Sequence, residues 1–195
     1  MKTKVFKVFD EIQKLTAVPF TLAAIAVRNW DRDLSPWPVP PVFRNSNGFP
    51  GGADAYLEKL TGTIVPEIKS GLSSEPLYTA IAGYSLAGLF AMYSLYRTDM
   101  FSRAASISGS LWYPGFAEFA MKESFCAAPD RIYLSVGDKE KSTRNSYMSK
   151  VEYCTEMLYG HYSSNGTDTV YELNKGDHFT DSALRTAKGI MAVMK

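Results

Sequence analysis

The sequence predicts an α/β fold, a three-layer sandwich in which helices cover both faces of a mostly parallel β-sheet. Short apolar runs alternate with stretches of helical spacing along the chain, and glycines and prolines separate them. The composition agrees, because 46% of the 195 residues are hydrophobic and 21% are charged, far from the values of disordered proteins. We expect a single domain over residues 1–195.

The expected elements follow one another in a regular order. Apolar residues at helical spacing over 5–15 predict an amphipathic helix, and the apolar run FTLAAIAV at 20–27 predicts a buried strand. Residues 28–52 contain five prolines and no clear period, which indicates a long loop of the kind that usually serves a function. Further helices are expected at 53–68, 86–96, 115–125, 145–162 and 182–194, and further strands at 77–84, 103–108, 131–136 and 168–173. Strands that alternate with helices in this way pair in parallel.

Charge and cysteine content argue against several classes of protein. A net charge of +1 does not suit a basic nucleic-acid-binding protein. The two cysteines, Cys126 and Cys154, are too few for a disulfide scaffold, so we expect packed thiols in a reducing compartment and a cytoplasmic protein. Two histidines do not suggest a multi-histidine metal site. The oligomeric state stays open, a homo-oligomer included.

Two segments resemble export or membrane signals only superficially. Charged side chains interrupt the apolar residues of 5–15, whereas a signal peptide needs an uninterrupted apolar stretch. Residues 76–96 carry no charge and are nominally long enough to cross a bilayer. Gly83, Ser85 and Gly88 break this run in the middle, which favours a buried strand followed by a buried helix over a membrane span.

The junction between this strand and helix contains a candidate nucleophile. The segment Gly83-Tyr84-Ser85-Leu86-Ala87 has small residues two places before and two places after Ser85. A sharp strand-turn-helix needs small residues there, because larger side chains would collide as the backbone folds back. The bare pattern occurs by chance in about one chain in ten of this size. Its position between an apolar strand and an apolar helix is what favours a nucleophile elbow.

A candidate base and two candidate acids follow in the order nucleophile, acid, histidine that is typical of α/β-hydrolases. The strand at 131–136 is followed by Asp138 and Glu140, and the last strand is followed by His178. The carboxyl ends of parallel strands meet at one edge of the sheet, where such folds keep their sites. His178 would take the proton of Ser85 while a carboxylate orients the imidazole ring. The residues alone leave both Asp138 and Glu140 open as the acid.

At this point the sequence resembles the putative-esterase branch of the α/β-hydrolases, which includes enterochelin (siderophore) esterases and esterase-D-like enzymes. The segments that carry the resemblance are AGYSLAGLFAMYSLY, FSRAASISGSLWYPGF, SVGDKEKSTRN and GDHF, with RNWDRDLSPW and GGADAYLEKL further upstream. The resemblance implies hydrolysis of carboxylic esters through a Ser85 acyl-enzyme, without a metal or an organic cofactor. It also favours Glu140, because enzymes of this kind keep their acid three residues after the glycine that ends the strand.

Five residues are candidates for binding a small-molecule ester: Tyr84, Trp112, Tyr113, Arg28 and Trp30. Trp112 and Tyr113 follow the end of a strand, and the alternative for them is a packed aromatic pair. Arginines and tryptophans in the long loop would suit an aromatic or anionic substrate through stacking and bidentate contacts.

The alternative for the long loop is structural. Arg32 and Asp33 would then form an ion pair that orders the loop, and Trp37 would cover the core. The sequence slightly favours this structural interpretation over a role in substrate binding.

The oxyanion hole raises a question about the start of the chain. The N–H of Leu86 is one expected donor, and the second normally comes from the loop after the third strand of the fold. Counted backwards from Ser85, the run at 20–27 is the fourth strand, so the third would precede Met1. The sheet would then lack its N-terminal strands. We expect an N-terminally incomplete copy; the alternatives are a strand from another chain or direct pairing of strands four and five.

Each missing oxyanion donor costs about 10²–10³ in rate, so low activity is expected of the chain alone. The runner-up to a serine esterase is therefore a non-catalytic or weakly active binding protein on the same fold. A third interpretation transfers the acyl group to an alcohol instead of water, and the sequence does not separate it from hydrolysis.

Overall fold

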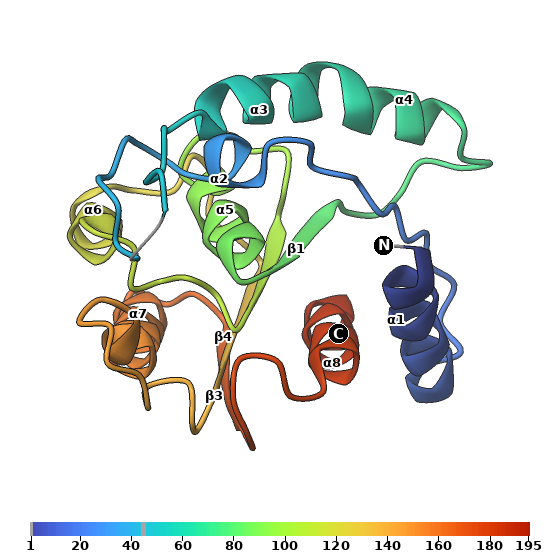
Figure 1. The fold of residues 1–195 in the computed structure, drawn as a ribbon. Coiled ribbons are helices and arrows are strands. Elements are labelled where there is room, and N and C mark those ends of the chain that lie inside the picture. The colour runs from blue at the N-terminus through green and yellow to red at the C-terminus, as the bar shows by residue number, and fades with distance from the viewer. Residues whose placement is uncertain (1, 44–45) are drawn as a thin grey trace.

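The computed structural model describes residues 2–43 and 46–195 and contains a four-stranded parallel sheet (Figure 1). The strands are β1 (Ala80–Tyr84), β2 (Arg103–Ile107), β3 (Arg131–Gly137) and β4 (Thr169–Asn174), and they lie side by side in sequence order. All three neighbouring pairs are parallel. The predicted α/β fold is confirmed, and the carboxyl ends of all four strands lie at one edge.

Helices cover both faces of this sheet (Figure 1). Helices α5 (Leu86–Ser94) and α7 (Val151–Ser164) pack on one face, and α8 (Ser182–Met194) packs on the other, where α1 (Lys2–Leu15) lies against it. The remaining helical segments are α2 (Trp30–Asp33), α3 (Ala53–Lys59), the π-helical turn Leu60–Ile64, α4 (Val65–Ser70), α6 (Phe116–Lys122) and the 3₁₀ turn Met148–Lys150. The layers are therefore those that the sequence predicts.

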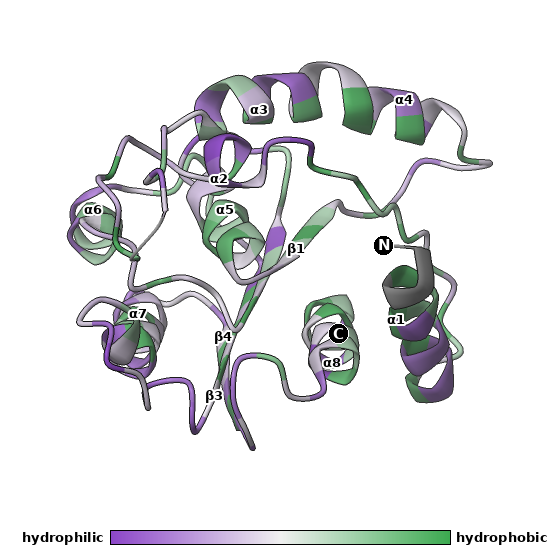
Figure 2. Ribbon diagram, viewed as in Figure 1, coloured by the Kyte–Doolittle hydropathy of each residue, from purple (hydrophilic) through white to green (hydrophobic). Residues whose placement is uncertain are grey.

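The strand pattern explains the two cores. Successive side chains of a strand point to opposite faces, so Leu134 joins the large core under α5 and α7, whereas Tyr133 packs with Val193 of α8. Helix α5 has eight of its nine residues buried and is mostly green in Figure 2, whereas α1 shows green and purple faces. Among the described residues, no helix is both long and apolar enough to cross a bilayer, and the uncharged run at 76–96 is β1 followed by α5.

Two expectations are wrong. The run at 20–27 has no regular secondary structure and is mostly exposed, and it joins no ladder among the described residues. Among the described residues β1 pairs with β2 alone and leaves its other edge open, yet this run does not pair with that edge, so the alternative of direct pairing between strands four and five is contradicted. The expected packing of both thiols also fails, because Cys154 is buried but Cys126 is exposed; neither is in a disulfide.

Candidate active site

Ser85 occupies the sharp turn between β1 and α5, with φ +60° and ψ −124°. This strained conformation is held from two sides. The Ser85 N–H donates to the carbonyl of Ile107 on β2 (3.1 Å), and the Ser85 carbonyl accepts from the N–H groups of Gly88 (2.9 Å) and Ser110 (3.0 Å). A side chain at Gly83 has no room, because its Cβ would lie 2.1 Å from the carbonyl oxygen of Ala87. The predicted turn is present.

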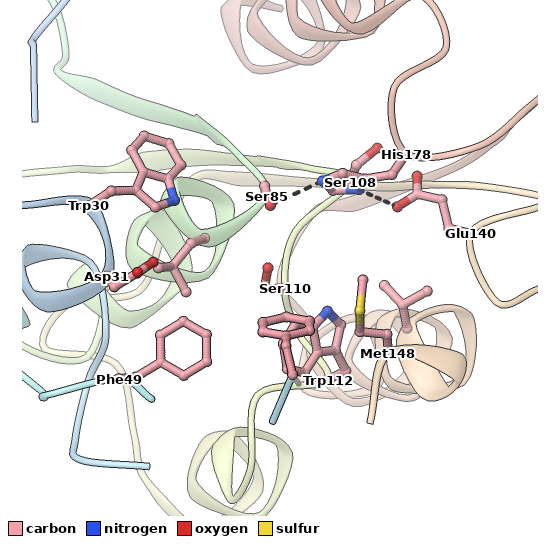
Figure 3. A pocket seen from close by; sticks show the side chains of 13 residues that line it. Trp30, Asp31, Phe49, Ser85, Ser108, Ser110, Trp112, Glu140, Met148 and His178 are labelled. Carbon is pink, nitrogen blue, oxygen red and sulfur yellow. Dashed lines mark hydrogen bonds and ion pairs between the residues drawn. The ribbon is translucent and has the colours of Figure 1, made fainter. Parts of the chain in front are cut away.

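Three side chains from the ends of three strands form a chain of hydrogen bonds (Figure 3). His178 Nε2 lies 3.1 Å from Ser85 Oγ, and His178 Nδ1 lies 2.7 Å from Glu140 Oε2. With the ring proton on Nδ1, the imidazole donates to the carboxylate and Nε2 is free to accept the Ser85 hydroxyl proton. The structure thus brings together Ser85, His178 and Glu140.

The two candidate acids have different surroundings. The Glu140 carboxylate is buried; its Oε1 accepts from the N–H of Gly137 (2.7 Å) and its Oε2 faces His178. Asp138 instead accepts from Lys175 Nζ (2.9 Å) and the N–H of Gly176 (2.8 Å). Only Glu140, of the two, contacts the histidine ring.

The pKa of Glu140 reflects opposing effects. Burial raises the pKa of this carboxyl, but hydrogen bonds from His178 and Ser108 and the proximity of the imidazole outweigh burial and leave the pKa below its ordinary value. Hydrogen bonds from Lys175 and Gly176 lower the pKa of the partly buried Asp138. Glu140 is therefore ionised at neutral pH despite its burial, which a group that orients an imidazole requires.

A buried arginine that the sequence did not single out lies beside Glu140. The Arg185 side chain, on α8, is only 2% exposed. Its Nη1 donates to Glu140 Oε1 (3.2 Å) and to Ser108 Oγ (3.3 Å), and its Nη2 donates to the carbonyl of Lys175 (2.7 Å). The available sequence signal was a single arginine on the otherwise apolar face of the helix that includes Ala187 and Val193.

Tyr84 supports the histidine loop and does not line the pocket. Its hydroxyl donates to the carbonyl oxygen of His178 (2.6 Å), and its ring meets the imidazole edge-on at 5.4 Å between centroids. The predicted substrate contact of Tyr84 is therefore wrong, and Tyr84 instead contacts His178. The reason is that Tyr84 precedes the turn at Ser85, so its side chain points toward the loop after β4.

A pocket of about 160 Å³ opens beside Ser85. Of the predicted substrate-binding residues, Trp30 and Trp112 line it, whereas Arg28 and Tyr113 do not. The Tyr113 hydroxyl points away and donates to the carbonyl of Trp37. The lining also includes residues that the sequence did not predict for this purpose: Asp31, Phe43, Phe49, Ser108, Ser110, Met148 and Val151 (Figure 3).

The structural alternative for the long loop holds for Arg32, Asp33 and Trp37, although Trp30 of the same loop lines the pocket. Arg32 pairs with Asp33 at 2.8 Å, and Trp37 packs against the aromatic rings of Tyr93 and Phe119. No arginine or lysine is among the described residues that line the pocket, so the structure does not support the expected arginine contacts to an anionic substrate.

Leu86, the predicted oxyanion donor, lines the pocket and is the first residue of α5. N–H groups in the first turn of a helix have no acceptor within the helix. The Leu86 N–H is therefore available to a ligand at Ser85.

Comparison with known proteins gives one family and several related folds. A model of the family described as "Putative esterase" matches residues 2–180. The protein YbbA of Bacillus subtilis (strain 168) is 28% identical over 141 residues, which cover 71% of this chain and 56% of YbbA. The chain thus spans little more than half the length of this relative.

Two examples illustrate the solved structures that share the fold. The siderophore hydrolase EstA from Aspergillus nidulans has a TM-score of 0.75 at 18% identity, covering 97% of this chain and 78% of EstA. An IroE-like serine hydrolase from Shewanella oneidensis has a TM-score of 0.68 at 21% identity, covering 84% of this chain and 56% of that protein. At such identities the likeness is one of fold.

Proposed function

Because the chain belongs to the putative esterase family, we propose that it hydrolyses carboxylic esters through an acyl-enzyme formed on Ser85. The observation that carries this proposal is the continuous chain of hydrogen bonds from Ser85 Oγ through His178 to Glu140. A serine hydroxyl is a weak nucleophile, and an adjacent base that is itself oriented by a carboxylate activates it.

The proposed reaction has two halves. Ser85 Oγ attacks the ester carbonyl carbon while its proton passes to His178 Nε2, and the N–H of Leu86 donates to the developing oxyanion. The tetrahedral intermediate collapses, the C–O bond to the alcohol breaks, and His178 returns the proton to the leaving alkoxide. Water then repeats the sequence on the acyl-enzyme, which releases the acid and free Ser85.

The pocket favours small acyl esters. Its volume of about 160 Å³ is well below the ~300–1,000 Å³ of sites that enclose drug-sized ligands. Its walls carry the aromatic rings of Trp30, Phe43, Phe49 and Trp112, which suit a short aliphatic or aromatic acyl group. A siderophore-type ester, the substrate class named for the hydrolase EstA, would place one ester arm here and extend into solvent.

The test compares variants on p-nitrophenyl acetate and p-nitrophenyl benzoate. We expect Ser85→Ala to abolish turnover and Glu140→Gln to lower kcat by up to about 10⁴-fold, because the imidazole loses its oriented tautomer. Asp138→Asn is the matched control, since an amide oxygen can still accept from the N–H of Gly176, and its kcat should stay within about threefold of wild type.

Two further measurements separate the competing functions. Mass spectrometry after a fluorophosphonate probe should find the adduct on Ser85 alone. Tight binding of an ester by both wild type and Ser85→Ala, with turnover by neither, would instead favour the binding protein with an incomplete oxyanion hole. A product mixture that shifts to a new ester when an alcohol is added would favour acyl transfer.

A further inference from the structure

We infer that Arg185 is a positioning residue of the active site, which fixes how the two oxygens of Glu140 are used. This inference rests on the proposed function, and it concerns a residue on α8, outside the three strand ends that supply Ser85, Glu140 and His178.

The two carboxylate oxygens have separate partners. Glu140 Oε1 accepts from Arg185 Nη1 (3.2 Å) and from the N–H of Gly137 (2.7 Å). Glu140 Oε2 lies 2.7 Å from His178 Nδ1. With Oε1 held twice, the carboxylate cannot rotate without breaking two bonds to a buried charge, so Oε2 stays directed at the imidazole.

Arg185 also joins the loops that surround the site. Its guanidinium contacts Ser108 after β2, Glu140 after β3 and the carbonyl of Lys175 after β4. Lys175 lies three residues before His178, so one rigid group fixes the relative position of the acid loop and the histidine loop. A planar fork with several donors can make these contacts together, whereas a lysine ammonium has one nitrogen.

The ion pair between Arg185 and Glu140 is buried, unlike an ion pair at the surface. The side chains of Arg185 and Glu140 are 2% and 3% exposed, so each would be an uncompensated charge without the other. Gly137 leaves room for this pair, because a Cβ there would lie 2.9 Å from Glu140 Oε1 and 3.0 Å from Arg185 Nη1.

The experiment compares Arg185→Met and Arg185→Lys with a matched control, Arg103→Met. Arg103 lies at the opposite end of β2, where it donates to the carbonyl of Val193 on the same helix α8 and stacks on Tyr78. It is a partly buried arginine that joins sheet and helix without touching the site. Each variant is assayed at a urea concentration and temperature where unfolding curves show it fully folded.

We expect Arg185→Met to lower kcat by about 10- to 100-fold with little change in KM, since the base is misoriented while the pocket is intact. Arg185→Lys should recover part of kcat, and Arg103→Met should lose stability but keep kcat. The second readout is the low-field proton NMR signal of the His178 Nδ1–H, identified by its loss in Glu140→Gln. This signal should shift or broaden in Arg185→Met and stay unchanged in Arg103→Met.

Unchanged kcat and an unchanged His178 signal in folded Arg185→Met would overturn the inference. If that variant does not fold, Arg185→Lys decides: wild-type kcat together with a wild-type signal would overturn it, and a shifted signal would support it. The NMR readout does not need turnover. A wild-type protein without esterase activity would therefore contradict the proposed function and still leave the role of Arg185 testable.

Discussion

Replacement of Gly83 by alanine should damage the turn at Ser85 more than its single methyl group suggests. The new Cβ would lie 2.1 Å from the carbonyl oxygen and 2.2 Å from the carbonyl carbon of Ala87. Real Cβ atoms stay at least 3.0 Å from such neighbours, so β1 and the first turn of α5 must separate by about 0.9 Å. Both contacts are backbone atoms, so no side-chain rotation relieves the overlap.

The magnitude follows from this displacement. Overpacking of a well-packed core costs about 1–3 kcal/mol, and we expect the upper end here because Gly83 itself and nearly all of α5 are buried. For a domain of this size, a loss of about 3 kcal/mol lowers Tm by about 6–12 °C. A shift of about 1 Å in the nucleophile costs about 10²-fold in rate, so kcat/KM should fall further than stability alone explains.

The assay pairs Gly83→Ala with Gly160→Ala. Gly160 lies inside α7, and a Cβ added there would meet no atom within 4 Å. The control should therefore gain about 0.5–1 kcal/mol, since alanine is the better helix former. Urea unfolding gives stability, and p-nitrophenyl acetate hydrolysis gives kcat/KM per folded molecule. A Gly83→Ala protein with wild-type unfolding midpoint and kcat/KM within threefold would refute the reasoning.

Three further predictions concern the residues around the base. The pKa of Glu140 in the folded protein lies below its ordinary value of 4.5, so its carboxylate stabilises the fold above pH 4.5, and this contribution is lost as the pH falls through the folded pKa. The difference in unfolding free energy between wild type and Glu140→Gln, measured by urea unfolding, should therefore shrink below pH 4.5. A difference that stays constant with pH would contradict this. Tyr84→Phe removes the hydroxyl that donates to the His178 carbonyl, so kcat should fall about fivefold, the equivalent of about 1 kcal/mol; an unchanged kcat would show that the ring contact suffices. Trp112→Ala removes an aromatic wall of the pocket, so KM should rise more for p-nitrophenyl benzoate than for the acetate; an equal rise for both would argue against a contact with the acyl ring.

The sequence is informative where local pattern and burial coincide. The strands β2 and β3 and the helix α8 lie within a residue or two of their predicted ranges, because each has apolar residues at the spacing of its element. The grouping of Ser85, Glu140 and His178 was also predictable, since each follows a strand and parallel strands bring those ends together.

The sequence does not predict features that depend on residues far away in the chain. The run at 20–27 has the composition of a buried strand, yet composition alone does not determine whether a run pairs with a neighbouring strand. Tyr113 fits a pocket or a packed position equally well by sequence, and the pocket role predicted for Tyr84 is wrong, because only the direction of each side chain decides its contacts. Arg185 stands out locally only as a single arginine on an apolar helix face, and its partner Glu140 lies 45 residues away in the sequence, so the local pattern does not identify the ion pair.

The bridging position of α8 has a consequence for biosynthesis. Ser85 and His178 are 93 residues apart, and the arginine behind Glu140 comes later still. A chain emerging from the ribosome can form the turn at Ser85 and the first three strands long before the residues that complete the site are made. Ser85 then lacks its base and is not activated, so we expect the growing chain to stay catalytically silent until His178 and the α8 arginine that fixes Glu140 are in place. Labelling by a serine-directed probe would consequently report the arrival of the last helix during synthesis.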